Sequence, residues 1–308
     1  MLSIALSALA AVAWAVPVSG AAPFFAGEHA GLVRRGSTLP QPARFRVNRD
    51  RGLLISTWVN GRGPYVFVID TGAGLNVVSQ WLVVSAGLKV SQTRQTVVGG
   101  LSGATTTSNR EATIDTLALG FQNNLLPPGK TAVIIGNLPA GIDGIVDPTE
   151  AFAPYGFTID MPNAQIAALD DGTELSFGSS GEGAIVEWIR RGDSDRPFVR
   201  LGDGRVALID TGSRFGLAIS DRQAIVVSRN NTPHTIPSLD LGGGAINARR
   251  VAPTTISIGD MVLRGIPTDI LYGVAADAPV ILGRDALNPF KISFDPRRRL
   301  IAFTNNER

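Results

Sequence analysis

The chain has 308 residues, of which 44% are hydrophobic and 18% charged, and 28 basic against 26 acidic side chains leave a net charge of +2. With 35 glycines and 19 prolines, this composition excludes a disordered chain and a helical bundle and is typical of a turn-rich globular protein built from strands. The chain has no cysteine and only two histidines, His29 and His234, which excludes disulfides and thiolate chemistry and disfavours a zinc site or a Ser-His-Asp triad.

The N-terminus carries an apolar stretch, LSIALSALAAVAWAV, over residues 2–16, followed by the small residues of PVSGAA. The stretch is too short to cross a bilayer easily and resembles a secretory signal peptide. We therefore expect a signal peptide over residues 1–22, an N-terminal extension or pro-segment over residues 23–43, and a secreted or periplasmic protein. No Lys or Arg precedes the apolar stretch, so its retention as a membrane anchor is the alternative. No later stretch approaches the length of a membrane span.

From residue 44 onward the pattern predicts strands. Asn60-Gly61 between two apolar runs is a strong hairpin signal, and the strand after it, YVFVI, ends at Asp70. A short helix is expected in QWLVVSAGL, ending at Gly87. The next two strands surround a glycine-rich tip over Gly99–Gly103, which predicts a mobile hairpin.

The second half of the chain repeats the first. Small polar residues accumulate over residues 170–183, and we place there a boundary between an N-terminal lobe, residues 44–178, and a C-terminal lobe, residues 179–308. The sequence RVALIDTGSRFGLAIS matches YVFVIDTGAGLNVVS, so Asp210 lies 210 − 70 = 140 residues after Asp70. Aligning Gly283 with Gly144 gives a similar offset, 283 − 144 = 139. A repeat this long indicates a duplicated domain, and we expect its two Asp-Thr-Gly turns to meet.

Two aspartates at hydrogen-bonding distance cannot both ionise easily, so Asp70 and Asp210 are expected to share one proton. The ionised member can deprotonate a water held between them, while the protonated member supports the oxygen of a peptide carbonyl. This chemistry requires no metal and no organic cofactor, and we expect neither.

The residues that follow the two aspartates are expected to support them: Thr71, Gly72, Thr211, Gly212 and Ser213. The glycines allow the backbone to turn close to a carboxylate. The threonine hydroxyls are placed to bond the opposite turn. The serine can donate to its own aspartate, whereas the alanine at the matching position of the first lobe cannot, so the two aspartates are expected to be electrostatically unequal.

The doubled hydrophobic-hydrophobic-Asp-Thr-Gly motif, with Ile142-Asp143-Gly144 and Ile281-Leu282-Gly283 downstream, resembles the aspartic peptidases. The motifs VNGRGPYVFVIDTGAG and VILGRDALNPFKISFD resemble those of bacterial retropepsin-like aspartyl protease domains more than those of vertebrate pepsins. The presence of two lobes in one chain, however, is the pepsin arrangement. The resemblance covers about residues 44–305. It implies an all-β, bilobal aspartic-protease (acid protease) fold with two pseudo-symmetric lobes and a central cleft, and Asp70 and Asp210 as the catalytic pair.

By the same resemblance, the hairpin tip is a flap that closes over an extended peptide substrate. The flap residues are Gly99, Gly100, Leu101, Ser102 and Gly103. The sequence departs from the family at two places. The flap lacks the tyrosine of pepsin-like enzymes, and the first lobe has Gly-Ile-Val-Asp-Pro, residues 144–148, where Gly-Arg-Asp is usual.

The function expected from these features is that of a monomeric aspartic endopeptidase acting on a peptide or protein between apolar residues. Basic residues do not cluster with aromatic ones, so no nucleic-acid partner is expected. Because a fold does not determine a function, a non-catalytic module that binds a peptide or a cell-wall component on the same fold is the alternative.

Overall fold

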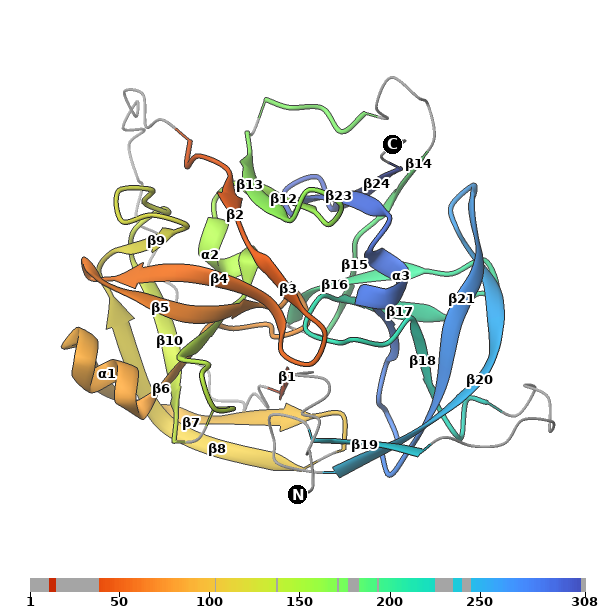
Figure 1. The fold of residues 1–308 in the computed structure, drawn as a ribbon, viewed down its shortest axis with the longest axis horizontal. Coiled ribbons are helices and arrows are strands. Elements are labelled where there is room, and N and C mark those ends of the chain that lie inside the picture. Colours follow the sequence, from red (N-terminus) through yellow and green to blue (C-terminus); the bar gives the residue numbers. More distant parts are fainter. Residues whose placement is uncertain are drawn as a thin grey trace, which may run out of the picture.

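The structure, a computed structural model, describes residues 11–14, 39–102, 104–136, 138–170, 172–176, 183–192, 194–224, 235–239 and 245–305. Over these residues the chain folds into three β-sheets and three short helices (Figure 1). A sheet from the first half of the chain and a sheet from the second half lie on opposite sides of the molecule, and the third sheet joins them.

The first sheet has the strand order β1-β7-β8-β10-β6-β11-β5-β4-β3, with β9 paired to β4. Its strands are β1 (Ala11–Trp14), β3 (Arg46–Asn48), β4 (Gly52–Val59), β5 (Arg62–Ile69), β6 (Val77–Ser79), β7 (Lys89–Gly100), β8 (Thr105–Ile114), β9 (Leu117–Leu119), β10 (Lys130–Ile135) and β11 (Gly144–Val146). The predicted hairpin at Asn60-Gly61 joins β4 to β5, and both residues adopt positive φ, as its tight turn requires.

The second sheet has the order β15-β16-β17-β22-β18-β21-β20-β19. Its strands are β15 (Ile189–Arg191), β16 (Ser194–Arg200), β17 (Val206–Asp210), β18 (Leu217–Ser220), β19 (Thr235–Leu239), β20 (Ala245–Ile258), β21 (Met261–Tyr272) and β22 (Val280–Gly283).

The third sheet takes strands from both halves, in the order β14-β24-β23-β12-β13-β2. Its strands are β2 (Ala43–Arg44), β12 (Gly156–Asp160), β13 (Gln165–Leu169), β14 (Gly183–Glu187), β23 (Phe290–Asp295) and β24 (Leu300–Asn305). The two halves meet where β12 pairs with β23, and there the rings of Phe157 and Phe294 stack with centroids 4.5 Å apart. The predicted boundary at residues 178/179 lies outside the described residues and stays a prediction.

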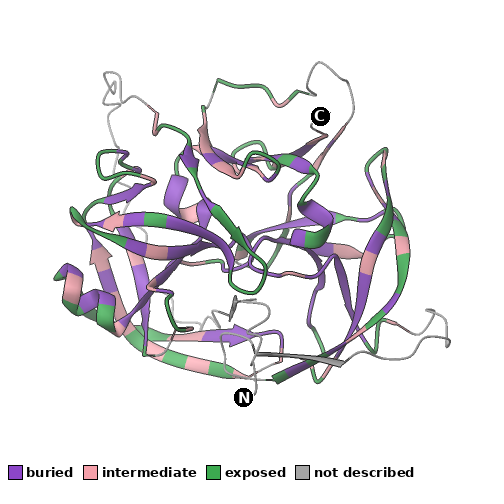
Figure 2. Cartoon of the chain, in the orientation of Figure 1, coloured by how far each residue is buried: buried purple, intermediate pink, exposed green. Residues whose placement is uncertain are grey.

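The helices are α1 (Gln80–Ala86), α2 (Pro148–Phe152) and α3 (Arg284–Leu287). The predicted helix before Gly87 is confirmed as α1. Ser79 caps it by accepting the Leu82 N–H at 3.1 Å, and Gly87 ends it at a φ of 65°. Buried residues follow the strands that lead toward the middle of the molecule (Figure 2).

Each lobe contains the same strand arrangement around its Asp-Thr-Gly turn. β11 lies parallel to β5 and antiparallel to β6, and β22 lies parallel to β17 and antiparallel to β18. Ile69 pairs with Val146 in the first lobe, and Ile209 pairs with Leu282 in the second. Val146 and Leu282 are therefore equivalent positions.

This register corrects the sequence alignment of Gly283 with Gly144, because the counterpart of Gly283 is Asp147. Gly144 meets a different requirement, since a Cβ there would lie 2.4 Å from Cε1 of Phe67. The sequence comparison matched two glycines that serve different contacts, and pairing between distant strands sets the true equivalence.

Strand β1 pairs antiparallel with β7, from Ala11 opposite Gly100 to Trp14 opposite Val97. Its residues belong to the stretch expected to be a signal peptide, and the other residues of that stretch lie outside the described ones. Among the described residues, none of the helices has the length and apolar character needed to cross a membrane. Cleavage of residues 1–22 and export stay predictions.

Candidate active site

Two buried strands deliver the two aspartates to the same place. Asp70 directly follows β5, and its N–H donates to the Val146 carbonyl at 3.1 Å, while Asp210 is the last residue of β17. Both side chains are fully buried, with 0% exposure. A Cβ at Gly72 would lie 2.8 Å from the Asp210 carboxyl carbon, so only glycine allows the two turns to approach this closely.

In each of the two carboxyls, one oxygen accepts a main-chain hydrogen bond and the other accepts none from the described residues. Asp70 Oδ1 accepts the Gly72 N–H at 2.8 Å, and Asp210 Oδ1 accepts the Ser213 N–H at 3.0 Å. Within the described part of the chain, neither Oδ2 receives a hydrogen bond from an N–H or hydroxyl group. The carboxyls are close enough for one to donate to the other once it carries a proton. Each Oδ2 is therefore available to a proton or a substrate.

Burial makes both aspartates harder to ionise than a free carboxyl. Burial, followed by the charge of Asp210, raises the pKa of Asp70 well above its usual range. Burial also raises the pKa of Asp210, to about 6, but the Ser213 amide, the Asp70 side chain and the charge of Arg284 oppose this rise. When the pair holds one proton, that proton belongs on Asp70 and the negative charge on Asp210.

The two threonines lock the turns together, as expected from their positions. Thr71 Oγ1 donates to the Ile209 carbonyl at 2.7 Å and accepts the Thr211 N–H at 3.1 Å. Thr211 Oγ1 donates to the Ile69 carbonyl at 3.0 Å and accepts the Thr71 N–H at 3.1 Å. Each hydroxyl satisfies two buried main-chain groups of the opposite lobe, so neither turn is complete without the other.

Replacing Thr71 or Thr211 by valine is expected to lower the free energy of unfolding by about 2–4 kcal/mol, because valine keeps the shape but leaves two buried main-chain groups unpaired. Urea denaturation monitored by fluorescence measures this change. Serine at the same position keeps the hydroxyl and is expected to recover more than half of the loss. A valine variant as stable as the wild type would contradict this role of the hydroxyl.

Comparison with known proteins agrees with this geometry. Residues 55–142, which include Asp70, match the family model described as "Aspartyl protease". This match covers less than a third of the chain and is a similarity of that segment to the family. The structure of the chain resembles the crystal structure of an aspartic proteinase from Irpex lacteus, with a TM-score of 0.54 and 11% identity over 87% of this chain and 97% of that one. At this identity the likeness shows the fold alone, and it confirms the bilobal aspartic-protease fold. A search of curated protein sequences gives no match.

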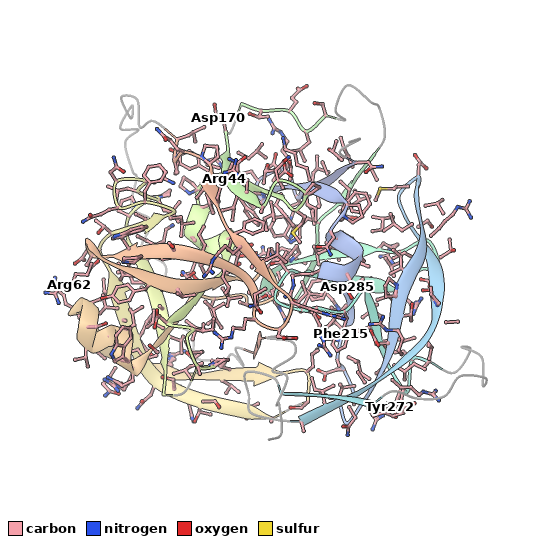
Figure 3. The ribbon with its side chains drawn as sticks, in the orientation of Figure 1. Arg44, Arg62, Asp170, Phe215, Tyr272 and Asp285 are labelled. Atoms are coloured by element: carbon pink, nitrogen blue, oxygen red, sulfur yellow. The ribbon has the colours of Figure 1, made fainter. Side chains whose placement is uncertain are left out.

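Ser213 acts differently from the expectation. Its main-chain N–H, rather than its hydroxyl, donates to Asp210, and Ser213 Oγ accepts the Phe215 N–H at 3.3 Å. Phe215 and Asp285 are labelled in Figure 3, and the Asp285 N–H donates to the Phe215 carbonyl at 3.2 Å. The Ser213 hydroxyl thus stabilises the turn around Asp210. The hydrogen bond between Asp285 and Phe215 connects this turn to the start of α3.

Arg284 is a buried support that the sequence reasoning did not single out. Its guanidinium donates to the carbonyls of Thr211 at 2.9 Å and Gly212 at 2.7 Å, and to the Arg49 carbonyl at 2.9 Å. Arg284 therefore connects the Asp-Thr-Gly turn of the second lobe to the loop between β3 and β4. The Gly-Arg-Asp signature at residues 283–285 was the available signal, and the structure explains why an arginine stands there.

Asp147 occupies, in the first lobe, the position of Gly283. It caps α2 by accepting the Thr149 N–H at 3.1 Å, and its own N–H donates to Asn76 Oδ1 at 3.0 Å. Burial, with a smaller contribution from the charge of Glu150, raises the pKa of Asp147 to about 8. A third carboxyl that stays protonated near neutral pH therefore stands behind the Asp70 turn.

Arg196, on β16, is a second buried arginine near the pair. A Cβ at Gly74 would lie 3.2 Å from Arg196 Cγ, so the arginine stem packs on the Asp70 turn. Its Nε donates to Ser194 Oγ at 2.9 Å, while Nη1 is buried without a hydrogen-bond partner among the described residues. Burial lowers the pKa of Arg196, and the charges of Asp210, Asp70 and Asp147 counteract this. The surrounding sequence, SDRPFVR, does not indicate that Arg196 is buried beside a carboxyl pair.

The predicted flap is a hairpin of β7 and β8. Gly99 and Gly100 end β7, and the Gly100 N–H donates to the Ala104 carbonyl at 3.1 Å. Leu101 is buried, Ser102 is half-buried, and Gly103 lies outside the described residues. Across the part of the chain that the structure describes, no group of three or more His, Asp or Glu side chains could hold a metal ion.

Proposed function

We propose that the protein is an aspartic endopeptidase that hydrolyses peptide bonds with a water activated between Asp70 and Asp210. The observation that carries the proposal is the position of two fully buried carboxyls in turns that lie against each other, each carboxyl with an Oδ2 that no described donor occupies. A buried carboxyl pair is costly unless it shares a proton, and such a pair supplies an acid and a base at one point. Because one chain supplies both aspartates, the active unit is a monomer.

The unequal surroundings of the two carboxyls assign their roles. Asp210, whose charge Arg284 favours, takes a proton from the water as the water oxygen bonds to the peptide carbonyl carbon. Asp70 gives its proton to the carbonyl oxygen, which produces a neutral tetrahedral diol. Asp210 then passes its proton to the amide nitrogen, Asp70 recovers one from the diol, and the C–N bond breaks to give an acid and an amine. No metal or organic cofactor takes part.

The substrate proposed is a peptide or protein segment in extended form. The edge of β7 over Val97–Gly100 is paired with β1 in this structure, so the substrate takes the place of β1 there, and the apolar side chains around the two turns favour apolar residues next to the cleaved bond. The flap has to open before the substrate arrives, since the two carboxyls are fully covered in this conformation.

The test is hydrolysis of a peptide library between pH 3 and pH 9, with the products identified by mass spectrometry. Cleavage by the wild type, and none by an Asp210→Asn protein purified in parallel, is the expected result. The matched variant excludes a contaminating peptidase. Cleavage by both proteins, or by neither when both are folded, would contradict the proposal.

The complete burial of both carboxyls favours a second candidate, a module that binds a peptide or a cell-wall component without cleaving it. On this reading the protein retains members of the peptide library in pull-down experiments at every pH and releases them intact. The same library therefore distinguishes the two functions.

A further inference from the structure

The tip of the flap hairpin carries a leucine that is almost inaccessible to solvent. Leu101 follows directly after β7, and only 1% of it is exposed. A large apolar side chain at the tip of a hairpin is normally exposed unless another part of the protein covers it. Leu101 is covered by the opposite lobe.

The covering residues form one apolar cluster of the second lobe. They are Phe215, Ala218, Ile246, Ala248, Leu271 and Ile281. Ile281 pairs with Leu208 on β17 and with Ala218 on β18. Paired residues share a face of a sheet, and so do residues two apart on a strand, so this cluster lies on the face to which Asp210 contributes its side chain.

A main-chain hydrogen bond holds the leucine in place. The Ala275 N–H, in the connection between β21 and β22, donates to the Leu101 carbonyl at 2.9 Å. The flap also contacts the first lobe, because Val98 packs in that lobe's cluster with Ala73 and Val77. One strand of the flap therefore packs on both lobes, with the fully covered carboxyl pair between their two turns.

We propose that Leu101 is a latch that fills an apolar side-chain subsite beside Asp210, so that the apolar side chain of an incoming peptide has to displace it. This inference rests on the proposed function for the identity of the ligand. The latch itself rests on the packing and the hydrogen bond of Leu101. In the free protein the closed flap competes with the peptide, and the observed affinity is reduced by the fraction of molecules that are closed.

The latch is tested by amide hydrogen exchange of the full chain, followed residue by residue by NMR. The Ala275 N–H reports latch opening because its acceptor is Leu101. The Gly283 N–H, which donates to the Gly216 carbonyl at 2.9 Å within the second lobe, is the internal control. In a Leu101→Ala variant, exchange at Ala275 is expected to rise by about tenfold to a hundredfold, with little change at Gly283. A Thr105→Ala variant, altered at an exposed flap residue, leaves both rates unchanged.

Competition with the ligand is tested by binding kinetics. The probe is a peptide analogue with leucine side chains in which a tetrahedral, hydroxyl-bearing carbon replaces the scissile carbonyl. Its association rate constant is expected to rise about tenfold in Leu101→Ala and to stay unchanged in Thr105→Ala. An unchanged or lower rate constant in Leu101→Ala would overturn the competition.

The two experiments separate failure of the latch from failure of the proposed function. Equal acceleration at Ala275 and Gly283, or no acceleration at Ala275, overturns the latch whatever the enzyme does. If no variant binds the analogue while Ala275 alone exchanges faster in Leu101→Ala, the latch stands and the peptidase proposal fails.

Discussion

Replacing either Asp70 or Asp210 by asparagine is expected to lower kcat by at least about a thousandfold, because each variant loses either the base or the acid of the reaction. Asparagine keeps an oxygen that can accept the Gly72 or the Ser213 N–H, so the fold should persist. The measurement is kcat on a peptide that the wild type cleaves, with circular dichroism to confirm folding.

The matched control is Asp143→Asn. The Asp143 carboxyl lies in the same lobe as Asp70, where its Oδ2 accepts the Val66 N–H at 2.8 Å, and an asparagine oxygen can do the same. This variant is expected to retain the kcat of the wild type. If Asp143→Asn were as inactive as the two aspartate variants, the loss would come from the fold rather than from the carboxyl pair.

The pH profile of the wild type follows from the same pair. Asp210 has to be ionised to act as the base, and its pKa is raised to about 6. Activity should therefore fall as the pH drops through about 6, and the optimum should lie nearer to neutral than to strongly acidic pH. Measurement of kcat/KM against pH checks this, and a maximum near pH 3 would contradict the raised pKa of Asp210, because the base would then be ionised well below pH 6.

Replacing Asp147 by asparagine is expected to stabilise the protein at neutral and alkaline pH. The pKa of Asp147 is about 8 in the folded chain, against an ordinary 3.8, so the folded state binds its proton more tightly than the unfolded state. The unfolded carboxyl ionises above about pH 4, and the wild type therefore loses stability as the pH rises from there toward 8. Asparagine does not titrate, and it caps a helix as well as aspartate does.

The expected result is equal stability of the two proteins near pH 4 and an advantage of the variant that grows up to pH 8. One pKa unit corresponds to about 1.4 kcal/mol, so the shift sets an upper limit of roughly 6 kcal/mol on that advantage. Charged groups near Asp147, namely Glu150, Asp195 and Arg196, are unchanged in the variant. Urea denaturation from pH 4 to pH 8 measures the difference, and a difference that does not vary with pH would show that Asp147 is ionised throughout.

Much of the site could be predicted because its signals are local. An apolar strand running into Asp-Thr-Gly, found twice at the spacing of a lobe, was sufficient to expect that Asp70 and Asp210 meet and that the threonines bond across the junction. The hairpin at Asn60-Gly61 and the helix that ends at Gly87 could also be predicted from local sequence signals. In each of these features, neighbours in the sequence are also neighbours in space.

What the sequence by itself determined is thus the duplicated β fold and the carboxyl pair. Only the tertiary structure decided that Asp147, and not Gly144, is the counterpart of Gly283, that Arg196 and Arg284 are buried beside the pair, and that Leu101 packs on the opposite lobe. These features depend on strand register and on contacts between residues far apart in the chain. Local sequence does not predict such contacts, because an arginine or a leucine can occupy an exposed turn as well as a buried site, and only packing against distant residues decides between the two.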